Sequence, residues 1–579
     1  MLAMVRRNVL QILCLLVILA LAVYRLFFGV ELTDESYYLS ASFRYLQGNI
    51  PFFDAWDAHV GSSLFSLPAL ALFYQATGGT EGIFLFFRLS FFCFMLLMGL
   101  VMYLATKSVL GRSTAFLAAS VLIVVAPFSL YNWSYNNLSL VLLCAGLFLL
   151  AFSLYAPTAK SERIAQVFAG ILLAFMVFVY FTQALTCLFV AVLFTVMASI
   201  KKKSIPKGLQ ASLFTALGGL GIAIVLTIPL LLVTQGKLLS YLPNVTSNPA
   251  VAAGGSSLFH ALYGVVVDTL RFIYQYWLPL ALGAVGILAV QLFKKRYPHL
   301  VILAPFFLIL ILFWLPNPKT TMTIIEFTAF IGLFWFLWIP FINKHSVEVK
   351  TLFWLLGLGG LISFLCVSLS SAGGAFQGKY MFFCLMLAVL MPVLEDIIRL
   401  PQAPIKQALT CVPVILLSGS LLLLWYQAFY RDAPISQLTT RVEQGIFAGV
   451  YTTPERAAAV MSLEEELSRL QRGNQSVLFL GHAHPAYTMI EMRAATPTVW
   501  IVDFSHPMFS DWFPLYYSQG ESFKPDLIIF IEDETYQSFL ANQDLELSGI
   551  IIHDYSFTEE VIVSESSFHI RLFTRNAAS

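Results

Sequence analysis

Long apolar runs separated by short polar loops repeat along the chain from residue 9 to residue 429. A membrane-spanning helix needs about 20 mostly apolar residues, because the hydrocarbon core of a bilayer is roughly 30 Å thick. Runs that approach this length predict thirteen spanning helices, at about 9–30, 82–106, 113–131, 136–156, 164–181, 183–200, 210–234, 272–293, 299–315, 322–342, 351–370, 380–395 and 407–429. The pattern therefore predicts an α-helical polytopic membrane protein.

The pattern changes after residue 430. Short apolar runs at 476–480, 498–502, 526–531 and 549–552 predict buried strands, and 454–471 predicts a helix. Strands that alternate with helices favour a small α/β domain with a largely parallel sheet. We therefore expect a transmembrane domain at 1–430 and a soluble α/β domain at 431–579.

Composition excludes a soluble protein of this size. The chain is 59% hydrophobic and 11% charged, with a mean hydropathy of +0.81, whereas charged residues make up about a quarter of an ordinary globular chain. The net charge of +1 gives no indication of a nucleic-acid partner. All seven cysteines lie in apolar segments, so no disulfide framework is expected.

Basic residues gather in alternate loops, for example at 201–203 and 294–296. Loops rich in Lys and Arg face the cytoplasm in most membrane proteins. This bias places the N-terminus in the cytoplasm and, with an odd number of spans, the C-terminal domain outside the cell membrane.

The first outer loop, residues 31–80, concentrates acidic residues. They are Glu31, Asp34, Glu35, Asp54 and Asp57. Carboxylates beside a bilayer are costly to desolvate, so such a cluster indicates a functional site. We expect Thr33 to cap a helix that starts at Asp34, and we expect 64–74 to form an interfacial or re-entrant helix that ends at Gly78-Gly79.

Two interpretations of Asp34 and Glu35 are open on the residues alone. Acids in the first turn of a helix complement its dipole, which stabilises many helices by a few tenths of a kcal/mol. Alternatively, one carboxylate takes a proton from an attacking hydroxyl at the membrane surface. Desolvation next to lipid would raise its pKa toward the useful range.

The sequence resembles the GT-C class of membrane glycosyltransferases. One N-terminal helix, a loop that opens with Asp34-Glu35-Ser36-Tyr37-Tyr38, and a dozen further helices are most similar to the bacterial branch related to protein O-mannosyltransferases and lipid A aminoarabinose transferases. The resemblance implies that Asp34 and Glu35 are catalytic. A second family element falls at Asp57-Ala58-His59, without the family's prolines, and implies a catalytic Asp57 and a substrate-binding His59. Where many relatives carry Asp after the third helix, this chain has Tyr135-Asn136-Asn137.

The same resemblance implies a sugar donor carried on a polyprenyl phosphate. This chemistry needs a base for the acceptor, an apolar groove for the prenyl chain and cations for the departing phosphate. The cationic candidates are Arg88, Arg271, Lys319 and Lys379, and Tyr380 follows the last of them. Snorkelling of a long side chain from a helix end to the lipid headgroups is the alternative for each cation. Tyr38 is expected either to stack on a sugar or to belong to an aromatic belt.

We therefore expect a glycosyltransferase that moves a sugar to a cell-envelope acceptor, which is a glycan, a lipid or a protein. A transporter or flippase, or a polymerase of lipid-linked glycans, is the alternative. No cofactor is required on this interpretation, although the class leaves room for a divalent cation, Mg²⁺ or Mn²⁺. His482 and His484, with Asp503 and His506, follow predicted strands, and polar loop residues are the favoured interpretation over a metal site.

Overall fold

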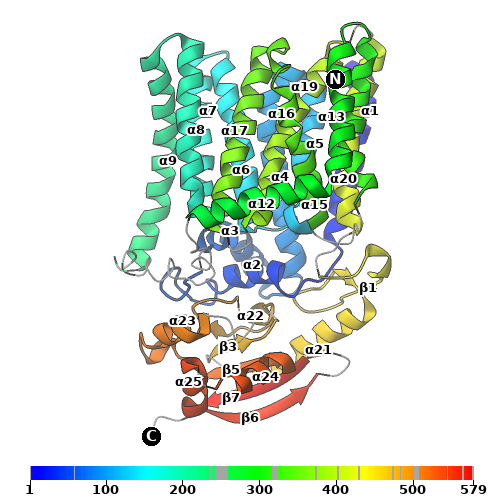
Figure 1. Ribbon diagram of the computed structural model, residues 1–579. Coiled ribbons are helices and arrows are strands. Elements are labelled where there is room, and N and C mark those ends of the chain that lie inside the picture. Colours follow the sequence, from blue (N-terminus) through cyan, green and yellow to red (C-terminus); the bar gives the residue numbers. More distant parts are fainter. Residues whose placement is uncertain are drawn as a thin grey trace.

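A computed structural model describes the chain except residues 1, 58, 235, 237, 239, 241–257, 316–321, 372–373, 401–402, 428–430, 472–474, 483, 501–507, 544, 564–565, 567 and 577–579. Its helices stand side by side as a bundle, and the sheet of the C-terminal region lies at one end (Figure 1). The first part of the chain runs through the bundle to α20, which ends at Gln427. Strands appear only after that helix among the described residues.

Nine helices of the described chain are long and apolar enough to cross a membrane, and a tenth is counted if the bent pair α12–α13 forms one span. This confirms the predicted class, a multi-span helical membrane protein. The long helices are α1 (Leu2–Leu26), α4 (Ile83–Leu110), α6 (Tyr135–Tyr155), α7 (Ala159–Val179), α8 (Ala184–Lys202), α9 (Ile205–Val233), α17 (Val347–Ser370), α19 (Phe382–Ile398) and α20 (Ala403–Gln427). In the bent pair, α12 (Leu258–Gln275) meets α13 (Trp277–Phe293) at 76°.

The predicted count of thirteen spans is too high by this measure, because three apolar segments form shorter helices. The first is α5 (Arg112–Ile123), which ends before Pro127 and Phe128, where φ is +56°. In the other two segments, short helices follow one another with breaks between them. These are η3 (Pro298–Leu303), α14 (Ala304–Leu308) and η4 (Leu310–Phe313), then α15 (Met322–Leu333) and α16 (Trp335–Trp338). Apolar content alone therefore overestimates helix length at these places.

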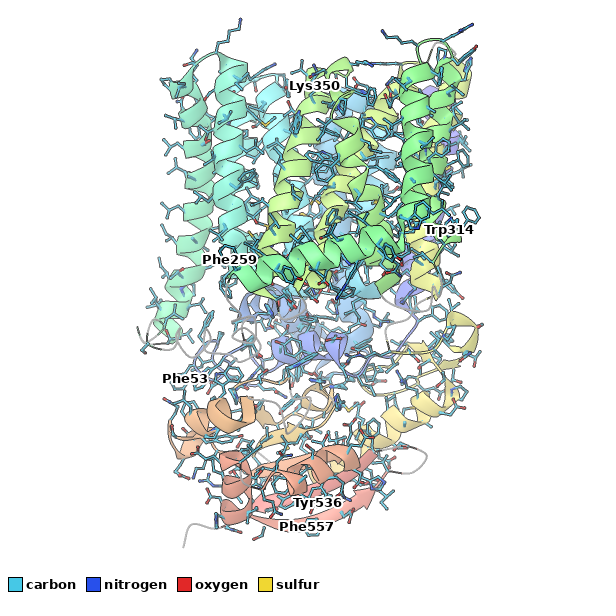
Figure 2. All side chains as sticks on the ribbon, in the orientation of Figure 1. Phe53, Phe259, Trp314, Lys350, Tyr536 and Phe557 are labelled. Atoms are coloured by element: carbon cyan, nitrogen blue, oxygen red, sulfur yellow. The ribbon has the colours of Figure 1, made fainter. Side chains whose placement is uncertain are left out.

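The bundle exposes large apolar side chains on its outer faces. Leu188 on α8 and Leu232 on α9 are 64% and 73% exposed, and Phe259 and Trp314 project from the bundle in Figure 2. Contiguous apolar surface of this kind is stable in lipid and unstable in water. The exposed faces of α8 and α9 therefore mark the membrane-facing side of the protein.

Two short helices occupy the first long loop, between the bundle and the C-terminal region (Figure 1). Almost every residue of α2 (Asp34–Phe43) is buried. Next comes α3 (Val60–Thr77), which ends at Gly78 with φ +73°, a left-handed conformation that favours glycine. The helix is longer than the predicted 64–74, and it ends at the predicted glycine. The loop is therefore a packed layer that joins the membrane bundle to the sheet.

The C-terminal α/β region, residues 431–579, contains a five-stranded sheet in the order β4-β3-β5-β7-β6. Its described elements are β1 (Thr440–Arg441), β2 (Tyr451–Thr452), α21 (Pro454–Leu470), β3 (Ser476–Leu480), α22 (Ala486–Met489), β4 (Arg493–Ala494), α23 (Met508–Tyr517), β5 (Leu527–Glu532), α24 (Asp533–Ala541), α25 (Glu546–Asp554), β6 (Tyr555–Ile562) and β7 (Phe568–Arg575). Pairing is parallel in β4-β3-β5 and antiparallel in β5-β7-β6, so the sheet is mixed.

Three expectations for this region need correction or qualification. The predicted strand at 549–552 lies inside α25, because a four-residue apolar run fits a half-buried helix as well as a strand. Residues 498–500 form no strand, and the remainder of that segment lies outside the described residues. The sheet is not largely parallel, because the unpredicted hairpin β6–β7 completes it.

Candidate active site in the first long loop

Glu31 organises the start of α2, the helix that carries the predicted catalytic pair. One carboxylate oxygen accepts the backbone N–H of Thr33 at 2.8 Å, and the other accepts that of Glu35 at 2.6 Å. The first N–H groups of a helix have no partner inside it. Thr33 makes no capping bond with its side chain, so the expectation that Thr33 caps this helix is wrong. Burial and the charge of Asp34 raise the pKa of Glu31 to about 7.

Glu35 and Arg88 form a buried, two-pronged ion pair between α2 and α4. Arg88 Nε and Nη2 each lie 2.7 Å from a different carboxylate oxygen of Glu35. The other guanidinium N–H groups donate at 2.9 Å to backbone carbonyls at the end of α1, those of Leu26, Phe28 and Gly29. Arg88 thus has no donor left for the phosphate that we expected it to bind. The geometry fits a positioning role for Glu35 and Arg88, and it leaves the predicted catalytic role of Glu35 untested.

Asp34, the first residue of α2, is more accessible than its neighbour. Its side chain is 21% exposed, whereas that of Glu35 is 2% exposed. Arg431, from the segment after α20, brings Nη2 to 3.6 Å from Asp34 and Nη1 to 3.9 Å from Glu31. The same guanidinium donates to the hydroxyl of Thr33. Asp34 is therefore the carboxylate of the predicted pair that a substrate can reach.

A group of aromatic rings lies next to Asp34, on the same face of α2. Tyr38 lies one helical turn after Asp34, so both side chains share that face. Its ring contacts Tyr135 at 6.0 Å between centroids, and Tyr135 stacks on His59 at 3.5 Å. The edge of Tyr180 closes the group at 5.5 Å from His59. The structure thus brings together Tyr38 and His59, two predicted substrate-binding residues.

His59 is a neutral ring with an unused hydrogen-bonding atom. Its Nδ1 is buried and has no partner among the described residues. Burial lowers the pKa of His59 to about 3, so the ring carries no charge at neutral pH. A neutral imidazole can accept from, or donate to, a sugar hydroxyl.

Asp57 anchors the loop to the C-terminal region. It accepts the hydroxyl of Thr498, and its Oδ2 lies 3.8 Å from Nη1 of the fully buried Arg44. Arg44 also donates to the carbonyl oxygens of Asp54 and Thr496, at 2.9 and 2.7 Å. Burial raises the pKa of Asp57. These contacts describe a residue that holds two parts of the chain together, and they leave its predicted catalytic role untested.

Lys379 and Tyr380 lie at the loop end of the bundle, beside α12. Lys379 Nζ is 4.9 Å from the ring centre of Phe272 and 5.7 Å from that of Phe376. Lys379 is therefore a cation placed between aromatic rings, where the apolar bundle meets the loop.

The other predicted donor-binding residues are placed less favourably. Arg271 is 78% exposed and pairs with Asp268 at 3.6 Å. Tyr380 is buried, and its hydroxyl lies 3.2 Å from that of Ser139. Lys319 lies outside the described residues. Glu326 accepts the hydroxyl of Tyr276 at 2.8 Å, which fits a structural or donor-pocket role.

The carboxyl ends of β3 and β5 carry a second polar pair. Glu532 accepts the backbone N–H of His482 at 3.0 Å and lies 2.8 Å from its ring Nδ1. The chain leaves β3 for β4 on one side and then crosses to β5 on the other, so these two strand ends form a topological switch point. Ligands bind at such points in open α/β sheets. His484, two residues further along, donates its backbone N–H to the carbonyl oxygen of Leu32 at 3.2 Å, so this edge of the sheet faces the first long loop.

Sequence reasoning missed Arg44 and Arg431, which hold the acidic residues. Arg44 is a lone cation close to five acids in a short loop, and that imbalance was the available signal. Arg431 follows the last span and is 398 residues from Thr33 along the chain. The contact of Arg431 with the acidic loop is therefore visible only in the folded chain.

The carboxylates of the loop do not gather as metal ligands. Among the described residues, no group of three or more His, Cys, Asp or Glu side chains is placed to hold an ion. Glu35 forms an ion pair with Arg88, and Asp57 accepts a hydrogen bond from Thr498 and lies next to Arg44. Asp503 and His506, which we considered beside His482 and His484, lie outside the described residues. The divalent cation that the class allows stays a prediction.

The fold and the site define a multi-pass helical membrane protein with an acidic, aromatic layer between its bundle and its sheet. No known family model and no curated protein matches the sequence. Among solved structures, ArnT from Cupriavidus metallidurans aligns over 97% of both chains, at 12% identity and TM-score 0.41 in the apo state, and at 14% and 0.42 bound to undecaprenyl phosphate. The Archaeoglobus fulgidus oligosaccharyltransferase, in a complex with zinc and sulfate, aligns over 96% of this chain and 72% of its own, at 11% identity and TM-score 0.40.

Proposed function

We propose that this protein is a membrane glycosyltransferase, which transfers a sugar from a polyprenyl-phosphate donor to a cell-envelope acceptor at the outer face of the membrane. The observation that carries the proposal is the accessible carboxylate of Asp34. It lies on one helix face with Tyr38, where the apolar bundle meets the C-terminal α/β region. The resemblance of the Asp34-Glu35 motif to GT-C enzymes supports the same assignment.

In this mechanism Asp34 accepts the proton of the acceptor hydroxyl while the hydroxyl oxygen bonds to the anomeric carbon. The bond between that carbon and the phosphate oxygen breaks, and the lipid phosphate leaves with its electron pair. Lys379, at the loop end of the bundle, supplies positive charge for the departing phosphate. Glu35, held by Arg88, fixes the start of α2 so that Asp34 stays in place.

The acceptor side of the reaction fits the C-terminal α/β region. The switch point at β3 and β5 presents His482 and Glu532, whose side chains are 41% and 24% exposed, at the edge of the sheet that contacts Leu32. A carboxylate and an imidazole suit the hydroxyl groups of a glycan. We assign the acceptor to this edge, between the sheet and Asp34.

The proposal places the loop and the C-terminal region outside the cell. The N-terminus lies at the other end of the bundle (Figure 1), and Lys350 lies at that end in Figure 2. Since basic loops face the cytoplasm, that end is assigned to the cytoplasmic side.

The distribution of charge favours an enzyme over a transporter. Transporters commonly place ionisable groups and broken helices near the midplane of the membrane. In the long spanning helices described here, charged residues lie within about two turns of a helix end, as Arg25, Arg88, Lys107 and Glu395 do. The chemistry therefore belongs to the membrane surface.

The test is a transfer assay with purified protein, a polyprenyl-phosphate sugar and an extract of envelope glycan acceptors. Asp34→Asn is expected to reduce the transfer rate by about 100-fold to 10,000-fold, the usual contribution of a general base. Glu465→Gln, an exposed acid on α21, is the control and should transfer at the wild-type rate. Equal rates for Asp34→Asn and wild type would remove Asp34 from the mechanism.

A further inference from the structure

A groove lies between α1, α4 and α5, and its lining is separate from the first long loop. Its volume is about 910 Å³, which falls within the range of ligand pockets, roughly 300–1,000 Å³. Most of its wall is apolar, from residues such as Leu15, Leu96 and Phe116. The groove contains nothing that the proposed transfer reaction uses.

The groove has the length of one lipid leaflet. On α4 its lining extends from Leu96 to Ser108, which at about 1.5 Å per residue is roughly 18 Å. Half of a hydrocarbon core of about 30 Å is about 15 Å. At Gly99 a Cβ atom would lie 2.8 Å from the side chain of Ile123, so the two helices close the floor there. An extended acyl chain therefore matches the groove in length.

One end of the groove is cationic. Lys107 and Arg112 line it there, together with Ser108 and Ser113. Both cations are exposed, and neither is part of an ion pair between described residues. Lys107 Nζ lies 5.8 Å from the ring centre of Tyr103. Two cations next to an apolar channel complement the phosphate of a lipid whose chain fills the channel.

Gln11 adds a buried acceptor to the same lining. The residue is 3% exposed, and its Nε2 donates to the hydroxyl of Thr410 at 2.8 Å. Its Oε1 is buried and has no hydrogen-bond partner among the described residues. A buried carbonyl oxygen without a donor is unfavourable. A ligand that carries a hydroxyl group would satisfy it.

We propose that this groove binds one anionic phospholipid with a hydroxylated headgroup. The acyl chain lies along α4 and α5, the phosphate contacts Lys107 and Arg112, and the headgroup hydroxyl donates to Gln11. The basic loops assign this end of the bundle, and hence the lipid, to the cytoplasmic leaflet.

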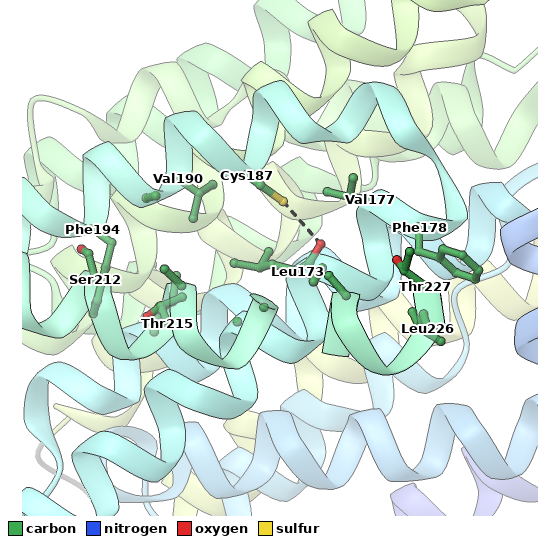
Figure 3. Close-up of a pocket in the computed structure, with 17 residues that line it drawn as sticks. Leu173, Val177, Phe178, Cys187, Val190, Phe194, Ser212, Thr215, Leu226 and Thr227 are labelled. Carbon is green, nitrogen blue, oxygen red and sulfur yellow. Dashed lines mark hydrogen bonds between the residues drawn. The ribbon is translucent and has the colours of Figure 1, made fainter. Parts of the chain in front are cut away.

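A second cavity has an apolar wall like that of the groove but lacks its cations. It lies between α7, α8 and α9, has a volume of about 420 Å³, and is drawn in Figure 3. Its lining is apolar apart from residues such as Ser212 and Thr215, and it includes no charged side chain. It therefore offers no site for a phosphate, and the proposal is confined to the groove of α1, α4 and α5.

The charge arm of the test uses native mass spectrometry of the detergent-purified full-length protein with added phosphatidylglycerol or phosphatidylcholine. Wild type is expected to retain one phosphatidylglycerol at concentrations at least tenfold below those needed for phosphatidylcholine. The double variant Lys107→Gln/Arg112→Gln should lose this preference. Lys207→Gln, an exposed cation at the start of α9, is the control and should retain it. Equal retention of both lipids by wild type, or an unchanged double variant, would overturn the proposal.

A packing arm keeps the test decisive if the charge variant fails to fold. Leu100→Trp fills the groove from a residue that is 50% exposed, and Leu217→Trp on α9 is a matched control at 50% exposure outside it. Phosphatidylglycerol retention should fall at least tenfold in Leu100→Trp and stay unchanged in Leu217→Trp. Equal retention by these two variants would contradict the assigned site. Neither arm depends on transferase activity.

Discussion

Four carboxylates of the first long loop differ in their hydrogen-bond and ion-pair partners. Glu35 is paired with Arg88 and Asp57 with Thr498 and Arg44, and Glu31 accepts backbone N–H groups at the start of α2. Asp34 lies 3.6 Å from the Arg431 guanidinium and keeps partial exposure, at 21% of its side chain. Similar side chains thus take different roles, because burial and partners set the proton affinity and accessibility of each.

The raised pKa of Glu31 predicts a pH-dependent stability. Its pKa of about 7 in the folded protein lies above its usual value of 4.5, so the folded state binds this proton more tightly than the unfolded state. The resulting stabilisation is complete below about pH 4.5 and is lost as the pH rises through 7. It amounts to roughly 3 kcal/mol.

Unfolding curves of wild type and Glu31→Gln, measured from pH 4 to pH 8, test this prediction. The stability of wild type relative to the variant should fall as the pH rises between about 4.5 and 7. Glu465→Gln, which alters an exposed acid, should follow wild type at every pH. A constant difference between wild type and Glu31→Gln across this range would show that Glu31 titrates normally.

At the scale of elements, the Glu35–Arg88 pair fastens α2 to α4 and to the end of α1. Three backbone carbonyls of residues 26–29 accept from the same guanidinium, so one side chain fixes three elements. Removing one partner of a buried pair leaves a charge without compensation, which costs about 3–5 kcal/mol. The position of Asp34 therefore depends on the ion pair between Glu35 and Arg88.

We predict that Arg88→Met lowers the thermal stability of the purified protein strongly and that Glu35→Gln/Arg88→Met recovers part of the loss. The recovery is expected because the double variant removes both charges of the pair, although the contacts of Arg88 with the backbone carbonyls remain lost. Arg469→Met, in an exposed pair on α21, is the control and should change stability by less than about 1 kcal/mol. A double variant as unstable as Arg88→Met would mean that the carbonyl contacts, and not the ion pair, fasten α2.

At the scale of the whole molecule, the C-terminal α/β region packs against the side of the first long loop that faces away from the bundle. Thr498 bonds Asp57, Arg44 bonds the carbonyl of Thr496, and His484 bonds the carbonyl of Leu32. The first long loop is thus held from both sides. Under the proposed function, the donor approaches from the bundle and the acceptor from the sheet.

This division predicts a separation of kinetic effects at the switch point. Under the proposed function, His482→Ala and Glu532→Gln should raise the KM for the acceptor about tenfold or more and leave the KM for the polyprenyl-phosphate donor unchanged. The reason is that, under the proposed function, both side chains bind the acceptor and neither binds the donor, and a hydrogen bond to a charged group contributes about 1.5–3 kcal/mol. His553→Ala, exposed at the end of α25, is the control. Equal changes in both KM values would point to a structural role for the pair.

The sequence by itself determined the membrane class, the positions of most long helices, the start of α2 and the strands β3 and β5. These features follow from local physics, since apolar length and side-chain periodicity act over neighbouring residues. Local patterns also misled at 549–552, where a short apolar run suits either a strand or a helix, and in the spans that break into short helices.

Only the tertiary structure decided which acid is accessible and which cation holds each one. Arg88, Arg431 and Thr498 reach the loop from positions about 50 to more than 400 residues away along the chain. The contact of Glu31 with the N–H groups of Thr33 and Glu35 is local by comparison, over two and four residues, and it was missed because Thr33 is the more usual type of capping residue. Burial and ion pairing depend on distances in space, and no local pattern of residues encodes them.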